Sequence, residues 1–214
     1  MIYCMSDIHG EADRFHAMLD LIHFSSDDTL YIIGDVIDRY SSGLDILREI
    51  METPNMVMLL GNHEQMCFDT LGPISVYGSR AMWQQNGGSK TYHELVYTYT
   101  AEEKNRVLEF IRKLPNHLDI EVAGRKFYLV HGKPSDYLED RIWERPKVDD
   151  PPPFEDCTAI VGHTPVCYLT GNKEETYKIW HGNGIIVIDC GCGMKTEHRR
   201  LACLRLDDMA EFYV

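Results

Sequence analysis

Five short segments of the chain place metal-binding and proton-carrying side chains directly after apolar runs. They are the sequences SDIHG (6–10), GDVIDR (34–39), GNHE (61–64), HG (131–132) and GH (162–163). Aspartate, histidine and asparagine supply the oxygen and imidazole ligands that suit manganese, iron or zinc. A buried carboxylate is costly unless a cation compensates its charge, so an aspartate at the end of a core strand either lies in solvent or binds a metal. Because the same placement recurs five times, the sequence favours a metal site.

The segments before these motifs are predicted to alternate between strand and helix. The predicted strands are 2–6, 29–34 and 56–60, and the predicted helices are 11–24, 43–52 and one that begins near Glu64. This order predicts a parallel sheet with right-handed crossovers. The carboxyl ends of parallel strands meet at one edge of a sheet, which is where ligands bind, so we expect the polar motifs to converge there.

The rest of the chain is predicted to contain a helical region, a loop and further strands. Residues 70–115 are polar and helical in pattern, and a capping box from Thr100 to Glu103 starts a helix there. The segment 133–156 includes the sequence DDPPPFED, cannot be regular throughout and is expected to form a surface loop. The predicted strands here are a hairpin over 117–132 that turns near Gly124, a strand in 158–163, and a final β pair of GIIVIDCG (184–191) with LACLRLD (201–207).

Length and composition are typical of one globular domain spanning residues 1–214. No segment reaches the roughly 18 apolar residues needed to span a bilayer, and the first residues lack the pattern of a secretory leader, so a cytoplasmic location is predicted. The formal charge of −13 argues against a nucleic-acid polymer or an anionic membrane as the partner. Seven scattered cysteines indicate a reducing compartment, and we interpret Cys190 and Cys192 as packing residues rather than as a metal or redox pair.

Together the motifs resemble the successive signatures of the calcineurin-like metallophosphoesterases, specifically the PPP-type serine/threonine phosphatases in their compact phage and bacterial forms. The likeness covers nearly the whole chain, including GNHEQM, WQQNGGSKT and IWER besides the metal motifs. It implies an α/β fold, a four-layer α/β/β/α sandwich, with two metal ions (manganese, iron or zinc) at the strand ends. It also implies that residues about 70–115 and 133–156 rim the substrate site.

The resemblance assigns a role to each matching residue. The implied metal ligands are Asp7 and His9 for the first metal, Asp35 as a bridge between the metals, and Asn62, His131 and His163 for the second metal. Asp38 resembles the carboxylate that orients His63, and His63 resembles the acid that protonates the leaving oxygen. Arg39 and Arg145 resemble the pair of arginines that binds phosphate oxygens.

The implied reaction is direct hydrolysis of a phosphoester by a metal-activated water, without a phosphoenzyme. The expected substrate is a phosphorylated protein or a small phosphoester, with serine/threonine phosphoproteins first. One alternative is a bis(5'-nucleosyl)-tetraphosphatase-like nucleotide hydrolase, although such relatives typically lack an aspartate in the place of Asp38 and have aspartate in the place of Glu64. The other alternative is a catalytically silent phosphate-binding module, which the intact ligands and acid disfavour. The sequence contains neither a C-x5-R phosphate loop nor a Walker loop.

Overall fold

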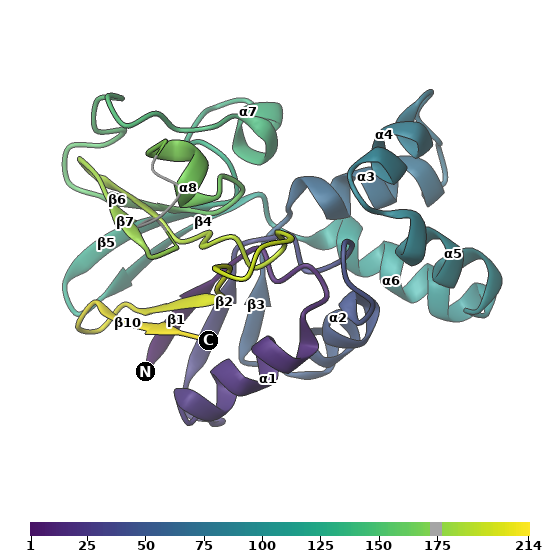
Figure 1. Ribbon diagram of the computed structural model, residues 1–214, viewed down its shortest axis with the longest axis horizontal. Helices are drawn as coiled ribbons and strands as arrows, with labels where there is room; N and C mark the ends of the chain where they lie inside the picture. Colours follow the sequence, from purple (N-terminus) through teal and green to yellow (C-terminus); the bar gives the residue numbers. More distant parts are fainter. Residues whose placement is uncertain (172–176) are drawn as a thin grey trace.

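The computed structural model describes residues 1–171 and 177–214, and its strands form two five-stranded sheets that face each other (Figure 1). In spatial order, the first sheet consists of β10 (Ala210–Tyr213), β9 (Ala202–Arg205), β1 (Ile2–Met5), β2 (Thr29–Ile32) and β3 (Met56–Met58). The second consists of β4 (His117–Val122), β5 (Arg125–Val130), β6 (Thr158–Val161), β8 (Ile185–Val187) and β7 (Trp180–His181). Each sheet has three parallel strands, β1-β2-β3 or β5-β6-β8, with antiparallel strands beside them.

The predicted parallel order of the first three strands is confirmed, and so is the hairpin of β4 and β5. The predicted final β pair is wrong. Strand β8, within GIIVIDCG, pairs with β6 and β7 in the second sheet, whereas β9, within LACLRLD, pairs with β1 and β10 in the first. The chain crosses from one sheet to the other between them, and the two segments meet at an isolated bridge of Gly191 with Arg200.

Helices and sheets stack in four layers, as expected. Helices α1 (Ala12–Leu21) and α2 (Gly43–Glu52) cover the outer face of the first sheet, and α7 (Leu138–Trp143) and α8 (Val166–Leu169) lie on the side of the second sheet (Figure 1). Successive side chains of β1 face opposite sides of the first sheet, which explains why layers form on both sides of it. Tyr3 and Met5 pack in the core shared with α1 and α2, and Cys4 packs between the two sheets. Val166 of α8 packs on the outer face of the second sheet, so this fourth layer is thin.

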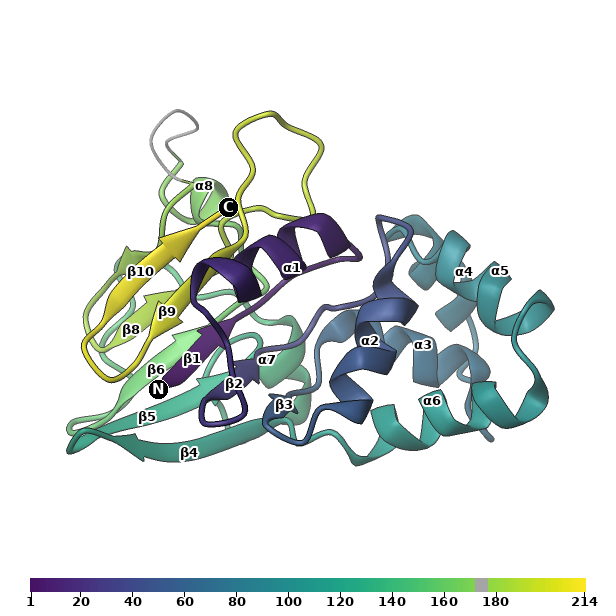
Figure 2. The same ribbon diagram turned by 90° about the horizontal axis from the view of Figure 1, so that it is seen from below.

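The remaining helices gather at one end of the sandwich (Figure 2). They are α3 (Asn62–Leu71), α4 (Ser79–Gln85), α5 (Ser89–Tyr97) and α6 (Ala101–Lys113). The capping box is confirmed, because the Thr100 side chain accepts a bond from the Glu103 backbone and the Glu103 side chain accepts one from the Thr100 backbone. The segment 133–156 is irregular apart from α7. No helix among the described residues is both long enough and apolar enough to cross a membrane.

The two cysteines of the C-x-C sequence lie in different parts of the core. Cys190 is buried between the two sheets, and Cys192 is buried in the core beneath α1 and α2. Neither thiol belongs to a potential metal-binding group among the residues that the structure describes. Burial of both thiols in apolar cores is what the packing interpretation expects.

Candidate metal centre and acid pair

The predicted site residues come from the ends of strands in both sheets. Loops after β1, β2 and β3 of the first sheet and after β5 and β6 of the second meet at the end of the sandwich where α3 begins. Eight of the predicted side chains are buried there, namely Asp7, His9, Asp35, Asp38, Asn62, His63, His131 and His163. The expected convergence is confirmed, but it occurs between two sheets rather than along the edge of one.

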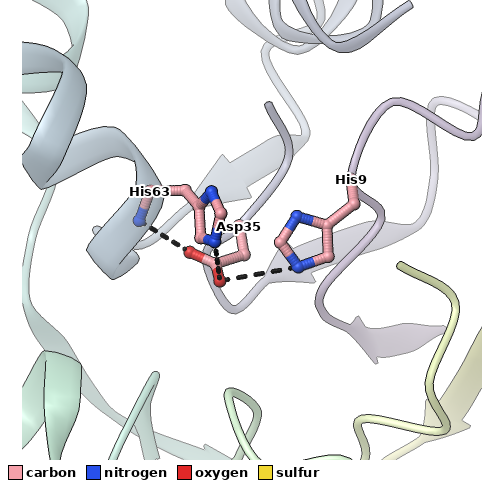
Figure 3. A group of neighbouring side chains, drawn as sticks. All are labelled: His9, Asp35 and His63. Atoms are coloured by element: carbon pink, nitrogen blue, oxygen red, sulfur yellow. Dashed lines mark hydrogen bonds and ion pairs between the residues drawn. The ribbon is translucent and has the colours of Figure 1, made fainter. Parts of the chain in front are cut away.

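Asp35 belongs to two groups of side chains that could each hold a metal ion. One group is His9, Asp35 and His63, and the other is Asp35, His131 and His163; within each group the ligand atoms lie within 4.8 Å of one another. Asp35 Oδ2 is 3.7 Å from His9 Nε2 and 3.9 Å from His63 Nε2, and these side chains point toward one another from two loops and the first turn of α3 (Figure 3). Asp35 Oδ1 is 3.3 Å from His131 Nε2. The carboxylate thus has one oxygen turned toward each group.

Hydrogen bonds to the backbone fix which nitrogen of each imidazole faces the groups. The bonds to carbonyl oxygens are His9 Nδ1 to Ile37 at 3.2 Å, His131 Nδ1 to Ile33 at 2.8 Å, and His163 Nε2 to Trp143 at 3.0 Å. Because a carbonyl only accepts, the bonded nitrogen carries the proton, and the second nitrogen of each ring is left to face the cluster. Backbone partners of this kind are typical of metal-ligating histidines. This donor set fits a divalent metal such as manganese, iron or zinc.

Asn62 and Asp7 complete the cluster. Asn62 Oδ1 lies 2.9 Å from His163 Nδ1 and 3.0 Å from His131 Nε2, so it joins the second group. Asp7 stands at the edge of the first group, with Oδ1 3.9 Å from His9 Nε2 and Oδ2 accepting a bond from the His163 backbone at 3.0 Å. The six predicted ligand side chains therefore form one contiguous cluster.

The charges of this cluster depend on one another. Burial by itself raises the pKa of Asp35, but the nearby His131, His63 and His9 hold it well below its usual range. The pKa of His131 is raised to about 10, because the Asp35 charge outweighs burial. Burial lowers the pKa of His163 to about 3, with His131 contributing in the same direction. Without metal, His131 is thus the protonated histidine of the second group, and His163 is neutral.

His63 and Asp38 form a buried pair beside the cluster. His63 Nδ1 and Asp38 Oδ2 are 2.7 Å apart, and His63 Nε2 is turned toward Asp35. Burial opposes the charged imidazole, but the carboxylates of Asp35 and Asp38 raise the pKa of His63 overall. The indole Nε1 of Trp83 donates a second hydrogen bond to Asp38 Oδ2, at 2.6 Å.

The two predicted phosphate-binding arginines are exposed, unlike the cluster. Arg39 Nη2 lies 3.4 Å from His63 Nε2, so its guanidinium reaches the face of the acid pair. Arg145 Nη1 donates to the His163 carbonyl at 3.2 Å and to Thr164 Oγ1 at 3.4 Å. It also lines a hollow of about 380 Å³ together with Lys147 and Tyr168. Both arginines thus lie at the rim of the cluster, one on each side of it.

The backbone of the site is held in an uncommon conformation. Six of the nine described non-glycine residues with positive φ are site residues, namely Asp7, His9, Asp35, Asp38, Arg39 and His163. Such conformations persist where the surroundings enforce them. Part of the enforcement comes from the buried Glu64, whose carboxylate accepts bonds from the backbone N–H groups of Asp35, Val36 and Ile37 at 2.9 to 3.2 Å. Burial, with the Asp35 charge, raises the pKa of Glu64 to about 7.

Three residues near the site were not assigned a part in it from the sequence. Glu64 was noted as part of a motif but not as the group that holds the loop after β2. Trp83 lies within the resembling segment WQQNGGSKT, which carries no charge pattern that predicts a contact with Asp38. Asp189 follows β8 and is buried, and burial together with the Asp7 charge raises its pKa well above the usual range. Its position directly after an apolar strand is the signal that could have found it.

Comparisons with known proteins agree with this geometry. A sequence profile described as "Calcineurin-like phosphoesterase" matches residues 1–191. The symmetrical bis(5'-nucleosyl)-tetraphosphatase of Acidovorax ebreus (strain TPSY) is 30% identical over 132 residues, which cover 61% of this chain and 43% of that protein. Serine/threonine-protein phosphatase 2 of Escherichia coli (strain K12) is 31% identical over 131 residues, covering 61% of this chain and 57% of that one. The matched region is thus about half the length of these relatives.

Solved structures share the fold. The crystal structure of a metallophosphoesterase from Sphaerobacter thermophilus superposes with a TM-score of 0.61 and 20% sequence identity, covering 99% of this chain and 86% of that one. At this identity the likeness establishes the fold alone. Because the family profile spans most of the chain, this protein belongs to the calcineurin-like phosphoesterase family.

Proposed function

We propose that the protein is a metal-dependent phosphomonoesterase that acts on phosphoserine and phosphothreonine in proteins. The observation that carries this proposal is the pair of potential metal-binding groups that share Asp35, with the His63–Asp38 pair beside them. When bound, two divalent cations at these groups supply Lewis-acid activation of water and of the phosphoryl group. The residues in the second group would be Asn62, His131 and His163, and those in the first would be Asp7 and His9, with Asp35 between them.

His63 acts as the general acid in this proposal. Asp38 accepts from Nδ1 and so leaves Nε2 to face the leaving oxygen, while the raised pKa of His63 favours the protonated form that an acid needs. The exposed guanidinium of Arg39, 3.4 Å from the same Nε2, is placed to bind a phosphoryl oxygen next to that acid. Arg145 binds from the opposite rim, and the loops at 70–115 and 133–156 select the substrate.

His63 is also a possible metal ligand, because its Nε2 belongs to one of the two groups. Replacement of His63 by Asn separates the two roles. We expect the variant to keep about two metal ions per chain by elemental analysis, and to lose about 100-fold in kcat on phenyl phosphate but far less on 4-nitrophenyl phosphate, whose leaving group needs no proton. His181→Asn is the matched control, since His181 is an exposed strand residue that pairs with Glu211. Loss of one metal ion in the His63 variant would make this residue a ligand instead.

A second candidate is hydrolysis of dinucleoside tetraphosphates. It is favoured by the likeness to a symmetrical bis(5'-nucleosyl)-tetraphosphatase, which is about as close as the likeness to the protein phosphatase. Asp38 and Glu64 favour the protein phosphatase instead, because the resemblance expects other residues in a tetraphosphatase. The two candidates are separated by kcat/KM on a phosphoserine peptide and on diadenosine tetraphosphate, measured with the same manganese-loaded preparation. A higher kcat/KM for release of ADP from diadenosine tetraphosphate than for release of phosphate from the peptide would favour the second candidate.

A further inference from the structure

The segment 83–88, which comprises the last turn of α4 and the turn before α5, reaches into the site at two points. Trp83 is fully buried and its Nε1 donates to Asp38 Oδ2 at 2.6 Å. Gly87 accepts a bond from the backbone N–H of Arg39 at 3.3 Å. Asp38 and Arg39 are consecutive residues with φ of +74° and +65°, a conformation that needs support from its surroundings. The segment 83–88 therefore contacts both Asp38 and Arg39.

The bond from Trp83 determines how the Asp38 carboxylate is oriented. Oδ2 accepts from Trp83 Nε1 and lies 2.7 Å from His63 Nδ1, whereas Oδ1 is buried without a hydrogen-bond partner among the described residues. An indole N–H can only donate, so Oδ2 is the acceptor in that bond. The two bonds thus meet at Oδ2, where the carboxylate accepts from the indole N–H and, in the proposed function, from His63 Nδ1–H. Without the indole, His63 Nδ1 would be the one remaining hydrogen-bond partner of the carboxylate among the described side chains.

We propose that Trp83 is a positioning residue for proton donation by His63, acting through Asp38. This inference rests on the proposed function, because it requires His63 to act as the acid. The indole fixes the carboxylate, the carboxylate fixes the imidazole, and the imidazole keeps Nε2 turned toward the leaving group. The segment WQQNGG is then part of the machinery of the reaction and not only a rim of the substrate site.

Close packing around the indole is consistent with such a role. Gly88 lies against the ring, and a Cβ at this position would collide with Nε1 itself. The φ of Gly88 is −77°, so the backbone admits alanine and the obstacle is the indole. Tyr92 of α5 packs on the ring edge-to-face with centroids 6.1 Å apart. Gly88→Ala therefore displaces the indole without removing it, and serves as a second variant should Trp83→Phe fold poorly.

The test compares leaving groups in a double-mutant cycle. Trp83→Phe keeps an aromatic ring but removes the donor, and we expect kcat on phenyl phosphate to fall about tenfold while kcat on 4-nitrophenyl phosphate changes less than about twofold. In the His63→Asn background, Trp83→Phe should have no further effect on either substrate. Gly88→Ala should act in the same direction as Trp83→Phe. Trp180→Phe, on β7, is the matched control and should change neither rate.

A readout in the metal-free protein tests the bond independently of activity. The chain has three tryptophans, so three indole N–H signals are expected in a ¹H–¹⁵N spectrum, and the signal missing in Trp83→Phe identifies Trp83. A hydrogen bond to a buried carboxylate predicts that the Trp83 indole proton has a downfield chemical shift and exchanges slowly with solvent. In Asp38→Asn we expect this signal to move upfield and the proton to exchange faster.

Each outcome bears on the proposal in a stated way. Equal losses on both substrates, or a full further loss in the His63→Asn background, would show that Trp83 acts through general packing and would overturn the positioning role. If the chemical shift and exchange rate of the Trp83 indole proton are the same in Asp38→Asn as in the unaltered protein, the positioning role would be overturned as well. If the unaltered, metal-loaded protein hydrolyses neither substrate, the proposed function itself fails, and this inference fails with it.

Discussion

The strand-end loops and the rim around them are built in opposite ways. In the strand-end loops the side chains are buried and each imidazole has a backbone or carboxylate partner, as His9 and His131 show. At the rim, Arg145 is exposed and is held by two long hydrogen bonds, and Tyr77 before α4 is fully exposed. The first region leaves little freedom to its side chains, whereas the second can change shape around different ligands. Under the proposed function, the chemistry and the choice of substrate therefore have separate locations.

The largest effect is expected at the centre of the first region. Asp35→Asn removes the charge that both metal groups share, because each carboxylate oxygen faces a different group. We expect loss of metal binding and a fall in kcat of about 1,000-fold or more. Elemental analysis and the rate on 4-nitrophenyl phosphate check this. The control is Asp45→Asn on the exposed face of α2, and full activity in the Asp35 variant would contradict the metal assignment.

The next effect is a pH dependence of metal binding. In the metal-free protein His131 has a pKa of about 10, so it is protonated at pH 7, and it must lose this proton to bind a metal through Nε2. His163 has a pKa of about 3 and His9 one well below the usual range, so both are already neutral. The affinity should thus rise about tenfold per pH unit between pH 6 and 8. Calorimetry in buffers of different ionisation enthalpy should detect about one released proton, and binding without proton release would refute this charge distribution.

Features that depend on neighbouring residues could be predicted from the sequence, whereas contacts between distant segments could not. Strand periods, the capping box and the polar residues after each strand are local signals, and they predicted the elements and the convergence of the five motifs. The roles of the ten candidate residues, including Arg145, came from the family resemblance. The pairing of β8 and β9 could not be read in this way, because both segments are apolar and nothing local shows that the chain crosses between sheets. The contact of Trp83 with Asp38 joins residues 45 positions apart, and a tryptophan in an amphipathic segment is otherwise simply a core residue.

A smaller effect is expected at the rim. Arg145→Ala removes a guanidinium that is exposed, so its contribution to phosphate binding is weakened by solvent. We expect KM to rise about tenfold with little change in kcat or metal content. Arg112→Ala is the matched control, because Arg112 pairs with Glu109 on the exposed face of α6. A loss confined to kcat would instead place Arg145 in the chemical step.

The smallest effect isolates the helical part of the rim from the chemistry. Thr100 caps α6 by accepting from the Glu103 backbone, and α6 packs against α3, the helix that begins with Asn62 and His63. Thr100→Ala should lower Tm by about 3 °C, the usual cost of a lost N-cap in a chain of this size, and Thr100→Ser should restore it. Because the metal ligands are fixed by their own backbone partners, kcat and metal content should stay unchanged. A fall in metal content with the same variant would mean that the strand-end loops depend on the rim for their geometry, and that the two regions are not independent.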